Sequence, residues 1–161
     1  MLDQIKFFTE IGPIAESVAR DEKAARGWHA DIRVQRDRLP DCAQLLLNHE
    51  FYLCFLTAVD VSPEIEMIYQ FAHFDSPCIV VVRASAGAEK TVPSIASIYQ
   101  GAAWHEREAY DFFGMIFTGH PHLKHLILSR EDHNLKPLLK NEKRLKSYAD
   151  IFAPPAPPQA E

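Results

Sequence analysis

The chain has 161 residues, of which 47% are hydrophobic and 24% charged, and this balance indicates a folded protein of about one domain. It excludes a mostly disordered chain and a collagen-like fibre, and a chain of this size folds without a disulfide or metal staple. The formal net charge of −5 disfavours a nucleic-acid-binding protein, because such proteins are more often basic over the whole domain.

The N-terminal elements are predicted to be a helical segment and a strand. Apolar residues recur near helical spacing within residues 5–26. Pro13 divides this segment into two pieces, or the helix begins near Gly12. Residues 28–36 alternate between apolar and polar side chains, which predicts a half-buried strand.

The middle of the chain is predicted to form a helix and three strands. Pro40 and Asp41 begin a short helix that runs to about Glu50, since proline and an acidic residue suit a first helical turn. Residues 51–59 are apolar on both faces, as in a central strand. Strands at 65–71 and 78–84 follow, and the short loops between these strands favour antiparallel pairing.

The last predicted elements are one or two helical turns at 93–99 and a helix at 102–113, which ends at Gly114. The fold class is therefore α+β, with a small, mainly antiparallel sheet, packed helices and an extended irregular C-terminal arm.

Charge is unevenly distributed along the chain. Residues 1–119 carry 10 Lys or Arg against 17 Asp or Glu, whereas residues 120–149 carry 7 against 3 and hold four of the eight histidines. We therefore divide the chain into an α+β core at 1–119, a basic partner-docking arm at 120–149 and a proline-rich tail at 150–161 that we expect to be disordered. The basic stretch suits docking on an acidic protein and on an anionic membrane surface equally well.

Membrane insertion, secretion and an iron–sulfur site find no support in the sequence. The longest apolar run is far shorter than the roughly 20 residues that cross a bilayer. Residues 1–6 lack the pattern of a signal peptide, so we expect a cytoplasmic protein. Cys42, Cys54 and Cys78 form no CxxC motif, and we predict that all three are buried as small apolar side chains.

The helix at 102–113 is the most informative segment, because it packs four charges, a histidine and four aromatic residues into three turns. Trp104, Glu108 and Asp111 share a face, and Arg107 lies four residues before Asp111, where it is expected to pair with that carboxylate. Since the aromatic residues also need cover, we expect some carboxylates to be buried against arginine or backbone donors.

Two enzymatic interpretations of this helix are open. Glu108 and Asp111 have the spacing of an acid/base pair, and His105 and Glu108 with His120 or His122 have the residue types of a metal site. The motifs HExxH, GxSxG, GxxxxGK and GxGxxG are absent. The favoured interpretation is a buried polar network that fixes the helix and the following loop.

A series of short motifs lies between residue 25 and residue 141. They are Leu56–Asp60, Val92–Ile95, Tyr99, Glu106, Arg107, Glu108, Tyr110, Asp111, Phe112, Phe113, Gly114, Gly119, His120, Pro121, Lys124, Leu126, Ile127, Pro137, Leu138 and Lys140. Together these residues resemble one known family, the 30-kDa subunit family of respiratory complex I, which includes counterparts in membrane-bound hydrogenases. Leu139 stands where the family usually has arginine, and residues 129–135 lack an expected tryptophan and glycine.

The resemblance implies a non-catalytic structural or assembly subunit in the hydrophilic arm of a complex I-like NADH:quinone oxidoreductase. It implies partners, namely the large quinone-site subunit and iron–sulfur subunits, at the cytoplasmic side of the inner membrane. No catalytic, cofactor or metal residue is expected in this chain. The parent complex is expected to carry Fe–S clusters with FMN, NADH and quinone, or a NiFe centre.

Three alternatives stand beside this interpretation. The first is the equivalent subunit of a membrane-bound energy-converting [NiFe] hydrogenase or ferredoxin-linked complex. The second is a stand-alone metalloenzyme that uses His105, Glu108 and His120. The third is an adaptor that recruits a membrane complex through residues 120–149 without belonging to it.

Overall fold

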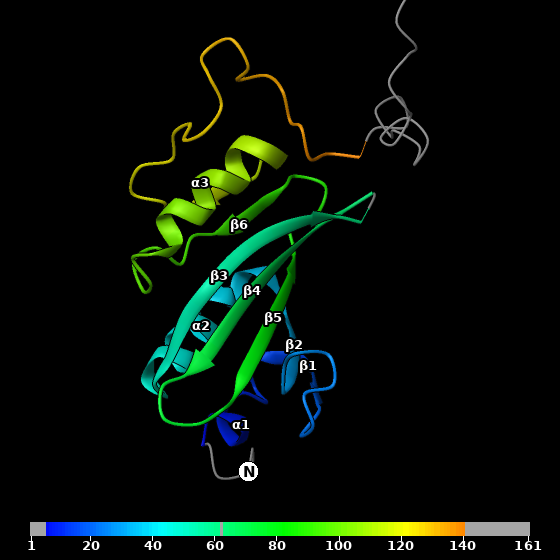
Figure 1. The fold of residues 1–161 in the computed structure, drawn as a ribbon, viewed down its shortest axis with the longest axis vertical. Helices are drawn as coiled ribbons and strands as arrows, with labels where there is room; N and C mark the ends of the chain where they lie inside the picture. Colours follow the sequence, from blue (N-terminus) through cyan, green and yellow to red (C-terminus); the bar gives the residue numbers. More distant parts are fainter. Residues whose placement is uncertain (1–5, 62, 141–161) are drawn as a thin grey trace, which may run out of the picture.

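The computed structural model describes residues 6–61 and 63–140, which form a five-stranded sheet, a two-stranded sheet and short helices (Figure 1). In chain order the elements are α1 (Phe7–Glu10), β1 (Ala15–Arg20), β2 (Ala30–Val34), the 3-10 helix η2 (Arg36–Arg38), α2 (Leu39–Asn48), β3 (Phe51–Asp60), β4 (Ile65–His73), β5 (Ile79–Ser85), β6 (Thr91–Pro93), α3 (Ala102–Phe113) and β7 (Ile116–Thr118).

The larger sheet has the strand order β1-β2-β5-β4-β3. Its β1–β2, β3–β4 and β4–β5 pairs are antiparallel, and β2 and β5 are parallel. The short loops between β3, β4 and β5 produce the antiparallel pairs, whereas β2 and β5 are far enough apart in the chain for a crossover. The α+β prediction with a mainly antiparallel sheet is confirmed.

One face of this sheet packs against α1 and α2 to make the core (Figure 1). Along β4 the side chains of Met67 and Tyr69 are fully buried and Ile68 between them is partly exposed, as the period of two predicts. The rings of Phe7 in α1 and Phe51 in β3 lie 5.3 Å apart in the same core. Each such buried side chain stabilises the fold by roughly 1.5–3 kcal/mol.

The prediction of a helical segment at 5–26 is wrong beyond its first turns. Only Phe7–Glu10 is helical, and Ala15–Arg20 forms β1, which pairs with β2 at the edge of the sheet. Pro13 ends the helical pattern, as its missing N–H and fixed ring require. Hydrogen bonds to β2 then stabilise Ala15–Arg20 as a strand, and they outweigh the weak helical preference that the apolar spacing indicates.

The strand predicted at 51–59 forms as β3, but the prediction that it is central is wrong, because β3 pairs only with β4 and lies at the edge of the sheet. β3 contacts α3, and the Tyr99 hydroxyl donates to the Phe51 carbonyl at 2.9 Å. Its pairing with β4 shifts register between Leu53 and Phe55, where Cys54 is exposed. The prediction that all three cysteines are buried is therefore wrong for Cys54.

The remaining predictions have mixed outcomes. Residues 93–99 hold a single turn, closed by the hydrogen bond from the Tyr99 N–H to the Ile95 carbonyl. The short parallel pair of β6 and β7 was not predicted. From residue 120 to 140 the arm has no helix or strand, as predicted, and residues 141–149 and the tail at 150–161 lie outside the described residues. In the described ranges, no helix has the length and apolar character needed to cross a membrane.

Candidate functional site

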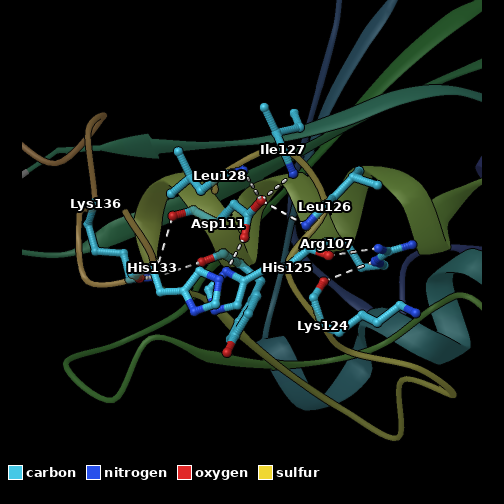
Figure 2. Close-up of polar contacts among 10 residues, drawn as sticks. Arg107, Asp111, Lys124, His125, Leu126, Ile127, Leu128, His133 and Lys136 are labelled. Carbon is cyan, nitrogen blue, oxygen red and sulfur yellow. Dashed lines mark hydrogen bonds and ion pairs between the residues drawn. The ribbon is translucent and has the colours of Figure 1, made fainter. Parts of the chain in front are cut away.

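The site is built on α3, whose bounds at Ala102–Phe113 agree with the sequence prediction. The buried residues Ala102, Glu106, Ala109 and Phe113 recur at helical spacing and face the rest of the core. Trp104, Arg107 and Asp111 have the same spacing on a different face, and the arm lies against that face (Figure 2). α3 therefore joins the core to the arm.

Asp111 is the centre of the junction between α3 and the arm. Its side chain is fully buried, and Oδ2 accepts the backbone N–H groups of Leu126, Ile127 and Leu128 at 2.9, 2.7 and 3.1 Å (Figure 2). Oδ1 lies 2.5 Å from Nδ1 of His125. Burial raises the pKa of Asp111, but the three amides and His125 outweigh it and lower the pKa to about 2.

Arg107 binds the carbonyl groups of the same segment. Its Nε donates to the Lys124 carbonyl at 3.0 Å, its Nη2 donates to the His125 carbonyl at 2.9 Å, and its guanidinium lies 5.2 Å from the centre of the Trp104 ring. The predicted ion pair between Arg107 and Asp111 is therefore wrong. Each side chain binds backbone groups of the arm instead: Asp111 accepts its N–H groups and Arg107 donates to its carbonyls.

Lys136 binds the C-terminal end of α3, and no sequence pattern predicted this role. Its Nζ donates to the carbonyls of Tyr110, Asp111 and His133 at 3.5, 3.4 and 3.2 Å. An ammonium at this position satisfies helix carbonyls that have no partner within the helix and interacts favourably with the negative end of the helix dipole. Lys136 lies more than twenty residues after α3, so its position depends on the tertiary path of the arm.

Gly114 is required at the end of α3 for two reasons. Its φ of +72° lies in the left-handed region that favours glycine. A Cβ at this position would also lie only 3.3 Å from Cε of Lys136. The end of the helix and the path of the arm are therefore fitted to each other.

Two backbone contacts attach the end of the described arm. The Leu138 N–H donates to the Phe112 carbonyl at 3.3 Å, and the Lys140 N–H donates to Oδ2 of Asp60 at 2.7 Å. Asp60 is the last residue of β3 and is largely buried. It belongs to the motif at 56–60 that carries the family resemblance, although no separate role was predicted for it.

Glu106 forms a second buried cluster on the core side of α3. Its Oε1 accepts the Ile95 N–H at 2.8 Å, and its Oε2 accepts the Ser94 hydroxyl at 2.6 Å. Burial raises the pKa of Glu106 to about 7, against the opposing effect of these two hydrogen bonds. The carboxylate thereby attaches α3 to the turn that follows β6.

His120 lies beside this cluster, at the beginning of the arm. Its Nε2 is 3.1 Å from the Ala103 carbonyl and 3.8 Å from Oε2 of Glu106, and its Nδ1 accepts the His122 N–H at 2.9 Å. This pattern fixes the neutral tautomer with the proton on Nε2, which donates to Ala103. Gly119, with φ of +80°, makes the turn into this position.

The two enzymatic interpretations do not fit this geometry. An acid/base role for Asp111 needs an accessible oxygen, but its side chain is fully buried and both oxygens have close partners. Both ring nitrogens of His120 already take part in hydrogen bonds, with the Ala103 carbonyl and the His122 N–H, so neither is free to bind a metal ion. Within the described ranges, no three His, Cys, Asp or Glu side chains are arranged to hold a metal ion.

The other residues that the sequence selected lie at or near the junction. Glu108 is half-buried on α3, while Pro121, Lys124 and Pro137 are exposed along the arm. Large apolar side chains are exposed here too, including Trp104 at 62% and Ile127 at 56%. Polar groups therefore hold the arm from inside, while some apolar side chains of α3 and the arm face outward.

The chain is similar in sequence to subunits of respiratory and related enzyme complexes. Residues 32–148 match the family described as the 30 Kd subunit of respiratory-chain NADH dehydrogenase. The matching subunit of the NADH-quinone oxidoreductase of Chlorobium phaeobacteroides is 37% identical over 127 residues, which cover 73% of this chain and 75% of that protein. The matching subunit of the F(420)H(2) dehydrogenase of Methanosarcina mazei is 32% identical over 113 residues, which cover 67% of this chain and 72% of that protein.

Two solved structures are also similar. A chain of the membrane-bound sulfane sulfur reductase, an archaeal respiratory membrane complex, has a TM-score of 0.72 and 25% identity, and the match covers 93% of this chain and 86% of that one. The trypsin-resistant fragment of Nqo5 has a TM-score of 0.61 and 20% identity. The match covers 76% of this chain and 98% of that fragment, and it shows the same fold.

Proposed function

This chain belongs to the 30 Kd subunit family of respiratory-chain NADH dehydrogenase, and from that membership we propose that it is a non-catalytic structural subunit of a complex I-like NADH:quinone oxidoreductase. It binds the large quinone-site subunit and the iron–sulfur subunits in the peripheral arm. The complex is attached to the cytoplasmic side of the membrane. Flavin, iron–sulfur clusters and quinone belong to the partner subunits.

The observation that carries this proposal is the junction of α3 and the arm. Asp111, Arg107 and Lys136 bind the backbone of the arm from inside, and Trp104 and Ile127 are exposed beside them. A segment without regular structure keeps a defined path only where its backbone groups find partners. The junction therefore presents the arm in one shape to a partner subunit.

A second parent complex is supported by the archaeal likeness. The sulfane sulfur reductase chain covers 93% of this protein at 25% identity, and the F(420)H(2) dehydrogenase subunit is 32% identical. An energy-converting complex that takes electrons from a donor other than NADH is thus the alternative. The structural role of this chain is the same in both cases.

Affinity purification of the tagged full-length chain from its native membranes, in mild detergent, tests the proposal. We expect a stoichiometric set that includes a large quinone-site-like subunit and iron–sulfur subunits. A co-purifying flavin module that oxidises NADH assigns the first parent complex, and its absence from an otherwise complete set assigns the alternative. A chain recovered alone, or bound only in substoichiometric and salt-sensitive amounts, contradicts the proposal.

Replacement of Arg107 by alanine distinguishes a structural role of this residue from a role in the chemical reaction. R107A removes two charge-assisted hydrogen bonds to the arm, each worth about 1.5–3 kcal/mol, so the amount of assembled complex should fall several-fold. Turnover per assembled complex should remain unchanged. R130A is the matched control, since Arg130 is an exposed arginine of the same arm. Full assembly of R107A with lost turnover would contradict a purely structural role.

A further inference from the structure

Trp104 is the most exposed large apolar side chain of α3 and of the described part of the arm. Its exposed fraction is 62%, against 56% for Ile127, 51% for Leu138 and 40% for Leu135. A tryptophan side chain buries roughly 150–250 Å² when it is fully covered. Trp104 therefore offers a partner more apolar area than any other side chain at this surface.

The exposed ring of Trp104 is held in place by its neighbour on α3. The guanidinium of Arg107 lies 5.2 Å from the centre of the ring, and it also donates to the carbonyls of Lys124 and His125 (Figure 2). The arm thus fixes Arg107, and Arg107 in turn orients the ring by a cation–π contact. A partner that covers an oriented ring loses less side-chain entropy than one that must first order it.

The charges around the ring are mainly positive. Lys124, whose carbonyl accepts Arg107, has an exposed side chain, and residues 120–140 carry four Lys or Arg against two Asp or Glu. On α3 itself, Glu108 is half-buried and Asp111 is buried against the arm. A surface complementary to this one combines an apolar pocket for the ring with carboxylates at the rim of the pocket.

We propose that Trp104 is the anchor of the interface with a partner subunit, which receives the ring in an apolar pocket with carboxylates at its rim. This proposal rests on the proposed function and names the residue through which the junction binds. Tryptophan and arginine are among the residues that most often dominate the binding energy of an interface. A membrane surface fits less well, because one face of α3 packs in the core and the arm covers another, so α3 has no continuous apolar face for lipid.

Competition between W104A and the wild-type chain, co-expressed in the native host, tests the anchor. The two chains differ in mass, so mass spectrometry gives their ratio in the assembled complex and in the whole extract. We expect W104A to be depleted from the complex by about tenfold or more. The urea midpoint of purified W104A should shift by no more than about 0.3 M, because the ring is mostly exposed.

F74A is the matched control, since Phe74 is an aromatic residue with an exposed fraction of 71% in the loop between β4 and β5, outside the junction. It should enter the complex at the wild-type ratio. Equal depletion of F74A and W104A, or no depletion of W104A, overturns the anchor. In both cases the wild-type chain still assembles, so the proposed function stands, whereas a wild-type chain that enters no complex contradicts the function itself.

Two further variants test the chemistry of the partner. K124E places a negative charge at the rim, so it should be depleted from the complex several-fold, and an unchanged ratio would contradict an acidic rim. In the purified W28F chain, Trp104 is the only tryptophan. Its emission maximum should not move when vesicles that contain phosphatidylserine are added, and a blue shift would assign the ring to a lipid surface and overturn the proposal.

Discussion

Asp111 organises the arm with one side chain, because a carboxylate has enough lone pairs to accept several donors at once. Three consecutive amides of the arm converge on Oδ2, and the histidine before them binds Oδ1. The charge is thus fully buried without being unpaired. A neutral side chain of the same size cannot supply the same set of acceptors.

We therefore expect D111N to lower the free energy of unfolding by roughly 2–4 kcal/mol, since the amide group replaces one acceptor oxygen with a donor that faces other donors. E108Q is the matched control on the same helix, and its effect should stay within about 0.5 kcal/mol because Glu108 is only half-buried. Urea denaturation of the three proteins measures both values. Equal losses in the two variants would show that Asp111 is not the centre of the junction.

Helical spacing identified the important residues at this scale but not their partners. It predicted that Arg107 and Asp111, four residues apart, would pair with each other, as they could on an isolated helix. The segment at 124–128 passes over both side chains and offers carbonyls to one and amides to the other. Which of these partners a side chain takes depends on the path of the arm, and no local pattern encodes that path.

At the scale of the elements, Gly114 ends α3 and leaves room for the Lys136 side chain of the arm. We expect G114A to cost about 1–2 kcal/mol of unfolding free energy, because alanine is strained at φ of +72° and its Cβ would displace the Lys136 side chain. Lys136 would then lose its contacts with the helix carbonyls.

Gly101 provides the control for this exchange. Its φ is −61° and a Cβ there meets no heavy atom within 4 Å, so G101A should change the stability by less than about 0.5 kcal/mol. Thermal or urea denaturation compares the two variants. If G114A were as stable as G101A, neither the backbone conformation at Gly114 nor its contact with Lys136 would matter for the end of α3.

Periodicity predicted the elements whose local pattern is strong and long. The helices at α2 and α3 and the strands β2, β4 and β5 correspond to the predicted segments. β1 was missed because its spacing also suits a helix, and only pairing with β2 decides between the two. β6 and β7 have three residues each and are separated in the chain by α3, so neither is long enough to show a strand periodicity. The apolar residues on both faces of β3 predicted a central strand, which is wrong, because β3 lies at the edge and its side chains Tyr52 and Phe55 are exposed.

At the scale of the whole molecule, the two buried carboxylates of α3, Asp111 and Glu106, make the stability depend on pH in opposite directions. The pKa of Asp111 is about 2 in the folded chain, below its usual 3.8, so its contribution of roughly 2 kcal/mol is present above pH 4 and is lost as the pH falls. The pKa of Glu106 is raised from 4.5 to about 7. Its stabilising effect is present below pH 4.5 and is lost as the pH rises to 7.

We therefore expect the free energy of unfolding to fall by roughly 3 kcal/mol between pH 4.5 and 7.5 through Glu106 alone. In E106Q this part of the dependence should disappear, because glutamine is neutral at every pH and still accepts the Ile95 N–H. Denaturant titrations at pH 4.5, 5.5 and 7.5 measure the two slopes. An identical slope in E106Q would assign the dependence to other groups.

The position of β5 in the sheet has a consequence for how the protein is made. β5 is the last strand of the larger sheet to be synthesised, yet it lies between β2 and β4 and pairs with both. Until Ile79–Ser85 leave the ribosome, β1–β2 and β3–β4 are separate hairpins, each with an apolar face that only the complete core covers. Folding of the sheet is therefore a late and cooperative step. Chains that stall before this strand expose the kind of surface that chaperones bind.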